Sequence, residues 1–394
     1  MPGKFYNMVL LSGFFLVTGF GTISAQPSID RGLINTPEQY EFMRQMVAQR
    51  EEPWISGYEI IPKYLEHQPQ PHKHYVDPAA HQGPPDDMIN SALGSDSQAA
   101  YASALHWIIS REEDHVEKTI EILNAWAWEL ERINPWQDGP LSTSYNWPRM
   151  IYAADIIRKT YDGWAQADQD QFADVLRNIV WKGTGGRGIN KDNKNNWRSH
   201  AVHARMTISV YLEEEQWFNE SVEILKDQIG SYCYPSGQSI ETARDVWHVQ
   251  MGLSGMVAAS EIAWHQGVDA YGYLNNRLLT CVEWHIPHIV GLEDADWPDS
   301  FDSPFYAPDH LREEDDYVAI WDRKVPVRSG NFDGPRNTGR VYHFYEKVFN
   351  HYHGRKGMDA PYTKKILTEE SPERAARTAG WGTLTHRKLY PAGE

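Results

Sequence analysis

Residues 101–130 read YASALHWIISREEDHVEKTIEILNAWAWEL and contain two apolar stripes at helical spacing. The stripes consist of Tyr101, Leu105, Ile108 and Ile109, and of Val116, Ile120, Leu123, Ala127 and Leu130. The same pattern returns between Phe172 and Val180 and between Phe218 and Ile229. Such stripes predict amphipathic helices that each bury one face. The chain is therefore expected to be a series of packed helices.

Helix ends are predicted at Asn134-Pro135, at Gly230 and at Gly267. Helices of about 12–18 residues joined by loops fit stacked antiparallel pairs. No repeat of fixed period is visible, which argues against a solenoid of identical units. Strand-like alternation is scarce. We predict an all-α fold, an incomplete (α/α) toroid or barrel of helical hairpins in a single domain.

The N-terminus has the features of a secretory signal peptide. Met1–Lys4 is positive, Met8–Phe20 is largely apolar, and Thr22–Ala25 offers small residues for cleavage. We expect residues 1–25 to be removed and residues 26–394 to form the catalytic domain of a secreted or periplasmic protein. No cysteine follows the apolar run and no later segment reaches ~18 apolar residues, so no membrane anchor is expected. Cys233 and Cys281 could be two buried thiols or a disulfide.

Composition excludes some partners and favours others. The formal net charge of −17 argues against nucleic acid, which binds to basic surfaces. It would also repel a polyanionic sugar unless the binding cleft is locally positive. A cluster of basic residues could supply that charge: Arg187, Lys191, Lys194, Arg198, Arg205 and Arg244. The 16 Trp and 21 Tyr provide rings of the kind on which sugar faces pack.

Polar residues near two predicted helix starts suit proton abstraction beside a sugar carboxylate. Asn196 offers an amide donor, and Arg244 offers a planar fork for carboxylate oxygens. Such donors would stabilise the enolate-like charge that forms when the C5 proton of a uronate leaves. His200 and His248 are candidates for proton transfer, and His203 shares a helix face with His200. The alternatives are a capping role for Asn196, an ion pair of Arg244 with a neighbouring carboxylate, and structural histidines.

Several segments together resemble the alginate-lyase-like superfamily of helical-toroid polysaccharide lyases over roughly residues 90–390. They are AAYASALHWIIS (99–110), ILNAWAWEL (122–130), NNW (195–197), ARDVWH (243–248), ASEIAWHQGVDAY (259–271) and FYEKVFNHYHG (344–354). The resemblance implies an (α/α) toroid and β-elimination on a uronic-acid saccharide.

The resemblance also implies roles for individual residues. Asn196 and Arg244 match the carboxylate-binding pair of the superfamily. His200 is the nearest candidate for its histidine, although it lies four residues past the asparagine rather than beside it. Trp247 and His248 stand where a tyrosine is expected, which leaves the general acid open. The stretch STSYNWPRM resembles a cleft-lining segment, so Tyr145 is a candidate proton donor. Expected substrate contacts are Asn195, Trp197, His203, Trp147 and Trp247.

The main expectation is an exported lyase that acts on an acidic polysaccharide or oligosaccharide. A dehydratase that eliminates water by the same chemistry, a toroid glycoside hydrolase and a non-catalytic sugar-binding protein are the alternatives. We expect no cofactor and no metal, because the His200–His203 spacing is not that of a zinc helix and Glu313–Asp316 lacks the spacing of a calcium loop. The oligomeric state is open. The stretch from Asp296 to Pro335 is expected to be a functional loop.

Overall fold

The computed structural model describes residues 31–75, 87–133, 139–186, 188–242, 246–290, 341–369 and 381–387. The expected signal peptide, the loop from Asp296 to Pro335, and Glu313–Asp316 lie outside these residues. Arg187 and Arg244 do as well.

Helices dominate the described chain. They are α1 (Pro37–Ala48), α2 (Trp54–Glu59), α3 (Asp87–Ser110), α4 (Glu113–Glu129), α5 (Gly139–Thr160), α6 (Gln166–Val175), α7 (Trp181–Gly183), α8 (Asn196–Tyr211), α9 (Glu215–Tyr232), α10 (Val246–His265), α11 (Tyr273–Val290), α13 (Tyr345–Phe349), α14 (Pro361–Glu369) and α15 (Gly382–His386). Two π-helical segments, η2 (Leu176–Val180) and η5 (Asn350–Arg355), continue α6 and α13. The strands of the described chain, β1 (His74–Tyr75) and β2 (Arg132–Ile133), form one short parallel pair.

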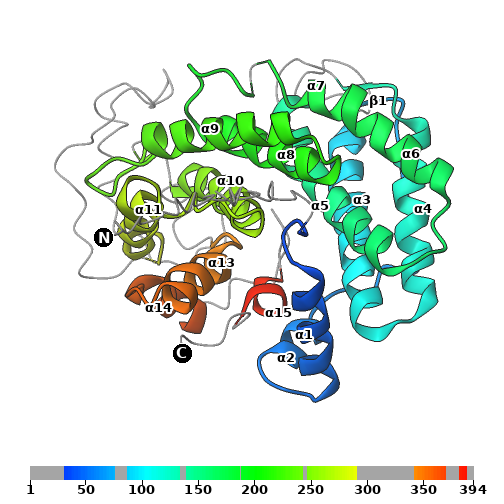
Figure 1. Ribbon diagram of the computed structural model, residues 1–394, viewed down its shortest axis with the longest axis horizontal. Coiled ribbons are helices and arrows are strands. Elements are labelled where there is room, and N and C mark those ends of the chain that lie inside the picture. The colour runs from blue at the N-terminus through cyan, green and yellow to red at the C-terminus, as the bar shows by residue number, and fades with distance from the viewer. Residues whose placement is uncertain are drawn as a thin grey trace, which may run out of the picture.

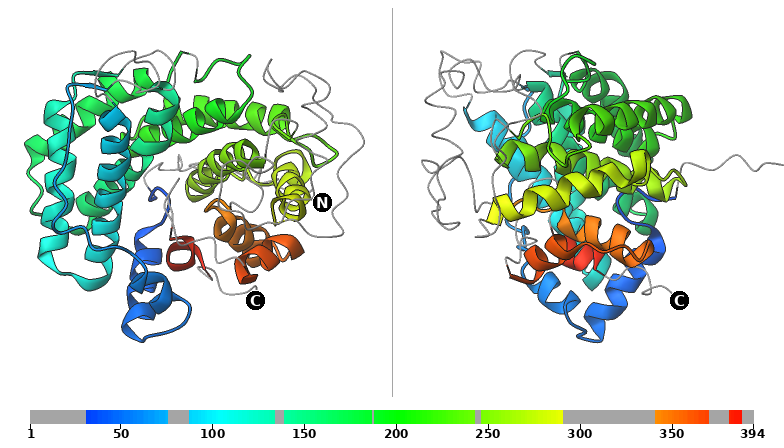
Figure 2. Two further views of the ribbon diagram at one scale, coloured as in Figure 1. Left: turned by 180° about the vertical axis from the view of Figure 1, so that it is seen from behind. Right: turned by 90° about the vertical axis from the view of Figure 1, so that its left-hand side faces the viewer.

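The helices form an inner and an outer layer around a common centre (Figures 1 and 2). In the inner layer α3 packs on α5, α5 on α8, and α8 on α10. The short helices α13, α15 and α1 continue this circuit back to α3. Outside it, α4 packs on α3, α9 on α8, and α14 on both α11 and α13. This arrangement confirms the predicted (α/α) toroid.

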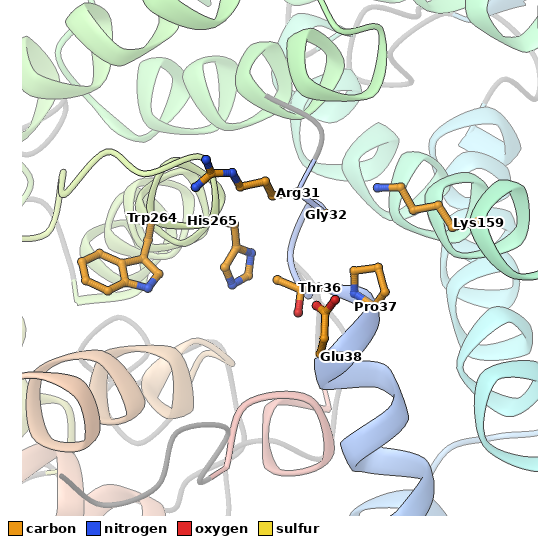
Figure 3. Close-up of a pocket in the computed structure, with 8 residues that line it drawn as sticks. All are labelled: Arg31, Gly32, Thr36, Pro37, Glu38, Lys159, Trp264 and His265. Carbon is orange, nitrogen blue, oxygen red and sulfur yellow. The ribbon is translucent and has the colours of Figure 1, made fainter. Parts of the chain in front are cut away.

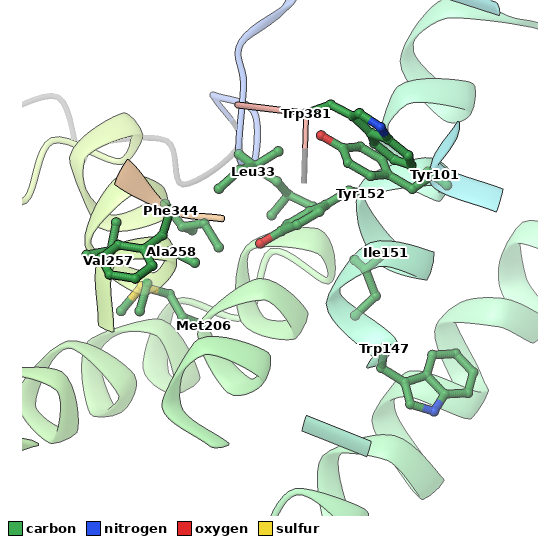
Figure 4. Close-up of a cluster of buried hydrophobic side chains, with 14 of the residues drawn as sticks. Leu33, Tyr101, Trp147, Ile151, Tyr152, Met206, Val257, Ala258, Phe344 and Trp381 are labelled. Atoms are coloured by element: carbon green, nitrogen blue, oxygen red, sulfur yellow. The ribbon is translucent and has the colours of Figure 1, made fainter. Parts of the chain in front are cut away.

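Side chains fill the centre of the toroid. Leu33, Tyr101, Tyr152, Phe344 and Trp381 come from five separate segments and meet in one buried cluster (Figure 4). The Tyr101 ring lies 5.7 Å from the Tyr152 ring and 5.9 Å from the Trp381 ring, centroid to centroid. Aromatic pairs at this separation stabilise a core beyond the apolar area that they bury. The interior is therefore packed protein and not an open pore.

The two inner helices that carry most of the expected site residues, α8 and α10, approach closely. A Cβ atom on Gly255 would lie 2.8 Å from the Ser199 carbonyl oxygen and 3.0 Å from the His200 nitrogen. A Cβ atom on Gly252 would overlap the Tyr232 phenol ring. Gly255 therefore allows α10 to pack closely on α8, and Gly252 allows it to pack closely on Tyr232 of α9.

The predicted helix ends are partly confirmed. Helix α10 ends at His265, and Gly267 follows with a φ of +86°, the left-handed conformation that suits glycine after a helix. The end predicted at Gly230 is wrong, because α9 continues to Tyr232 and Gly230 instead makes room for Leu274 of α11. Asn134-Pro135 lies outside the described residues. Cys233 and Cys281 are buried free thiols. None of the helices described is both long and apolar enough to cross a membrane.

Candidate active site

The first turn of α8 separates the roles of its two asparagines. Asn195 is the N-cap residue, and its side-chain oxygen accepts a hydrogen bond from the Trp197 N–H at 3.0 Å. This cap satisfies one of the free N–H groups at the helix start. Asn195 thus has a capping role, and the substrate contact expected of it stays a prediction. Asn196 is therefore not the capping residue of α8.

A buried carboxylate fixes Asn196. The Asn196 main-chain N–H donates to Glu241 Oε2 at 3.0 Å, and its side-chain Nδ2 donates to Glu241 Oε1 at 2.9 Å. Glu241 also accepts a hydrogen bond from the Tyr232 hydroxyl at 2.9 Å. Asn196 Oδ1 has no hydrogen-bond partner among the described residues. Since Nδ2 carries two hydrogens, the amide keeps one donor beyond its bond to Glu241.

The same network joins the start of α10 to the start of α8. The Tyr232 hydroxyl lies 3.2 Å from the His248 carbonyl oxygen and 3.1 Å from that of Val249. Burial, and then the neighbouring Glu241, raise the pKa of Tyr232 well above its usual value, so this hydroxyl stays a donor. Tyr232 and Glu241 were not predicted as site residues. Glu241 lies two residues before the ARDVWH segment, but its role depends on a partner 45 residues away in the sequence.

His200 lies one helical turn beyond Asn196, on the same side of α8. Its ring is fully buried, and neither ring nitrogen meets a described group in full hydrogen-bond geometry, although the main chain of Met251 in α10 acts on the ring to raise its pKa. The ring of Tyr145, from α5, meets it edge-on with 5.8 Å between centroids. Burial lowers the pKa of His200 to about 3, so the ring is neutral at neutral pH. The structure therefore brings Tyr145 and His200 together.

His203 lies deeper in the toroid. Its Nε2 is 2.5 Å from the Tyr152 hydroxyl, and its pKa is held well below the usual value by burial, with His200 and Lys347 adding to the effect. Trp147 is also fully buried, with its ring 6.3 Å from Trp126 and 6.1 Å from Phe172. Substrate contacts were expected of His203 and Trp147, and the structure corrects both to core positions.

The remaining expected residues lie around the helix starts. Trp197 is mostly buried in the first turn of α8. Trp247, in the first turn of α10, meets the Tyr342 ring edge-on at 4.6 Å. Gln250 Oε1 accepts hydrogen bonds from the Tyr342 N–H at 2.8 Å and the Tyr345 hydroxyl at 2.9 Å. The segment that enters α13 is thereby fixed across the start of α10.

Two of the basic residues expected to line a positive cleft have structural partners instead. Arg198 forms an ion pair with Asp227 at 2.5 Å. Arg205 stacks on the Trp181 ring, with its guanidinium carbon 4.2 Å from the ring centroid. Burial lowers the pKa of Arg205. These two side chains support α8 from outside the site.

The profile of the alginate lyase family matches residues 62–297, more than half of the 394-residue chain. The chain belongs to the alginate lyase family. Membership of this family makes it a carbon–oxygen lyase that acts on polysaccharides. The matched range includes Tyr145, Asn196, His200 and Glu241, so the network at the start of α8 lies within the alginate lyase region. A comparison with curated protein sequences finds no match.

Solved alginate lyases share the toroid. A Tyr-to-Phe variant of alginate lyase A1-III complexed with a tetrasaccharide has a TM-score of 0.63 and 12% identity, over 95% of this chain and 99% of that one. Alginate lyase A1-III from Sphingomonas species A1 has a TM-score of 0.62 and 13% identity, over 91% and 99%. An alginate lyase from Bacteroides ovatus has a TM-score of 0.55 and 14% identity, over 86% and 98%. At these identities the alginate lyase structures establish the common fold.

Proposed function

We propose that this chain is an exported lyase that cleaves a uronate-containing polysaccharide or its oligosaccharides by β-elimination. One observation carries the proposal. At the start of α8, a buried Glu241 orients the Asn196 amide one turn away from a buried, neutral His200 that contacts Tyr145. Export rests on the N-terminal sequence alone.

Asn196 would bind the acid group of the sugar. Its free amide hydrogen can donate to a uronate carboxylate, and a donor fixed before substrate arrives needs no reorganisation as charge develops. Glu241 determines which way the amide points, because only Nδ2 can donate to a carboxylate. Arg244 remains the second carboxylate ligand predicted from the sequence.

His200 would take the C5 proton. A neutral ring can accept it on a nitrogen lone pair, and the charge of a bound uronate would raise the low pKa of this buried histidine. The C4–O bond then breaks, and the Tyr145 hydroxyl donates a proton to the departing O4 oxygen. The product carries a C4=C5 double bond. Proton transfer from His200 back to Tyr145 restores both groups. His248 remains a second candidate for one of these transfers.

The test is incubation of the mature protein with alginate, glucuronan and glycosaminoglycan-type polymers and with their oligosaccharides. We expect a near-ultraviolet band from the unsaturated product together with shorter chains. Asn196→Ser should lower kcat by about 10²–10³-fold, the effect of removing one oxyanion donor. Asn219→Ser, on the exposed side of α9, is the matched control and should retain activity.

Each other outcome points to a different chemistry. An ultraviolet band without chain shortening would replace the lyase by a dehydratase. New reducing ends without the band would indicate a hydrolase, which needs two carboxylates across the scissile bond. Binding without any product would leave a sugar-binding protein. Any of these three results contradicts the proposal.

A further inference from the structure

A cavity of about 690 Å³ lies at the other end of the inner helices. It is lined by Lys159 at the end of α5, by Trp264 and His265 at the end of α10, by Glu38 in the first turn of α1, and by Arg31 in the segment before α1 (Figure 3). Lys159 follows Tyr145 by 14 positions in the same helix, which corresponds to about 21 Å along the axis. The cavity is therefore separate from the candidate active site. Its volume falls within the ~300–1,000 Å³ typical of small-molecule sites.

The cavity wall is tied together by hydrogen bonds between distant parts of the chain. The His265 Nδ1–H donates to the Leu33 carbonyl oxygen at 2.6 Å. The Gln266 Nε2–H donates to the Gly32 carbonyl oxygen at 2.7 Å, and the Arg31 N–H reaches Gln266 Oε1 at 3.4 Å. A capping box at Thr36 fixes the first turn of α1. The site is thus preformed and needs little ordering when a ligand binds.

His265 supplies an unused acceptor. Its side chain is only 2% exposed, and with Nδ1–H donating to Leu33 the Nε2 atom carries a lone pair. Nε2 has no hydrogen-bond partner in the described part of the chain, although Glu261 Oε1 lies 3.5 Å away. Burial lowers the pKa of His265 against the raising effect of Glu261. A ligand hydroxyl would satisfy this buried nitrogen.

The other lining groups suit a hydroxylated anion. Arg31 is exposed, and its guanidinium forms no ion pair or hydrogen bond within the described residues. Lys159 lines the cavity from α5, but its amine lies 2.9 Å from buried Asp155, and the Arg31 side chain extends away from it toward Trp264 (Figure 3). The Trp264 ring lines the cavity and lies beside Arg355 and Lys356, which are themselves paired with Glu261 and Asp269. Glu38 adds one carboxylate that can accept hydroxyl hydrogens.

We propose that this cavity is an accessory site for an acidic sugar, either a uronate monosaccharide or the end of an acidic oligosaccharide. The carboxylate pairs with Arg31, ring hydroxyls donate to His265 Nε2 and Glu38, and the sugar ring contacts the part of Trp264 that lines the cavity. The choice of an acidic sugar rests on the proposed function, whereas the site itself rests on the cavity.

The test follows the Trp264 indole N–H by nuclear magnetic resonance in the mature protein, with the signal assigned through Trp264→Phe. Sodium glucuronate should shift this signal saturably, and glucose should not. Arg31→Gln should weaken glucuronate binding about tenfold, equivalent to ~1.4 kcal/mol. Arg50→Gln is the matched control, because it removes an exposed arginine beyond the far end of α1. Asn196→Ser should leave the titration unchanged.

If sodium glucuronate does not shift the Trp264 signal of the wild-type protein, the accessory site is contradicted. Equal shifts with glucose and glucuronate overturn its preference for an acid, and equal weakening by Arg31→Gln and Arg50→Gln overturns the assigned contact. If the Trp264 signal no longer responds to glucuronate in Asn196→Ser, the cavity is not independent of the active site, which also contradicts the proposal. The proposed lyase activity is judged separately from its ultraviolet product, so the two failures are distinguishable.

Discussion

His200 and His203 lie three residues apart on α8 and are both buried, yet their contacts differ. His203 bonds the Tyr152 hydroxyl inside the core, whereas His200 meets no described group in full hydrogen-bond geometry and contacts Tyr145. A buried polar group without a well-aligned partner costs free energy, so its presence calls for a functional reason. These contacts support the proposed proton transfer by His200 and a packing role for His203.

This difference predicts opposite effects of the same substitution. His200→Gln should lower kcat by about 10²–10⁴-fold, the contribution of a positioned acid or base, with little change in Tm. His203→Gln should lower Tm, because it disturbs the buried bond to Tyr152, and should change kcat by only a few fold. Steady-state kinetics and thermal unfolding of the two variants make the comparison. Full activity in His200→Gln would contradict the assignment.

The sequence predicted Asn196, His200 and Tyr145 as site residues, and the structure places them in one region. From the sequence, Trp147 was expected to contact substrate, but it lies in the core. Helix α5 is buried on nearly every side from Gly139 to Ile157, so no polar face indicates which side of the helix meets the site. Glu241 was missed for another reason. Its importance comes from hydrogen bonds to Asn196 and Tyr232, and no local pattern encodes that pairing.

At the scale of helices, the contact between α8 and α10 matters most for the site. The two helices touch where Gly255 faces the main chain of Ser199 and His200. Main-chain atoms cannot rotate away as a long side chain can. Any side chain at position 255 must therefore move the helices apart and displace His200.

Gly255→Ala should destabilise the fold by ~1–3 kcal/mol, the usual result of overpacking, and should also lower kcat. Gly94→Ala is the matched control within a helix, because the nearest atom to its added Cβ would be Asn146 Oδ1 at an ordinary 3.8 Å. Removing a helical glycine without a clash should stabilise the fold by ~0.4–1 kcal/mol. Denaturant unfolding measures both changes. Equal changes for the two glycines would refute the close contact.

The predicted apolar stripes correspond to real helices, since burial of one face produces the periodicity. The helix end at Gly267 was readable because glycine occupies a left-handed position there. The end at Gly230 was not, because that glycine serves the contact with Leu274 in another helix. Gly252 and Gly255 of α10 likewise serve contacts with α9 and α8, and only the packing of the helices reveals these contacts.

Across the whole molecule, histidine burial couples folding to pH. The described residues include nine histidines whose pKa burial lowers: His106, His115, His200, His203, His265, His285, His288, His351 and His386. The pKa is about 4 for His106 and His288 and about 3 for His200, His285 and His351. In the unfolded chain a histidine has a pKa of ~6.5. Between these values the unfolded state binds more protons than the folded state.

Stability should therefore be complete above about pH 6.5 and should fall as the pH drops toward the folded-state values. We expect Tm to decrease markedly between pH 7 and pH 5, with uptake of several protons on unfolding. His288→Phe removes one buried histidine that packs on Trp284, and it should reduce the proton uptake by about one. His353→Gln, at an exposed position, is the control and should leave the slope unchanged. Calorimetry across this range measures the slope, and a Tm that stays constant from pH 7 to pH 5 would contradict the neutral, buried state of these rings.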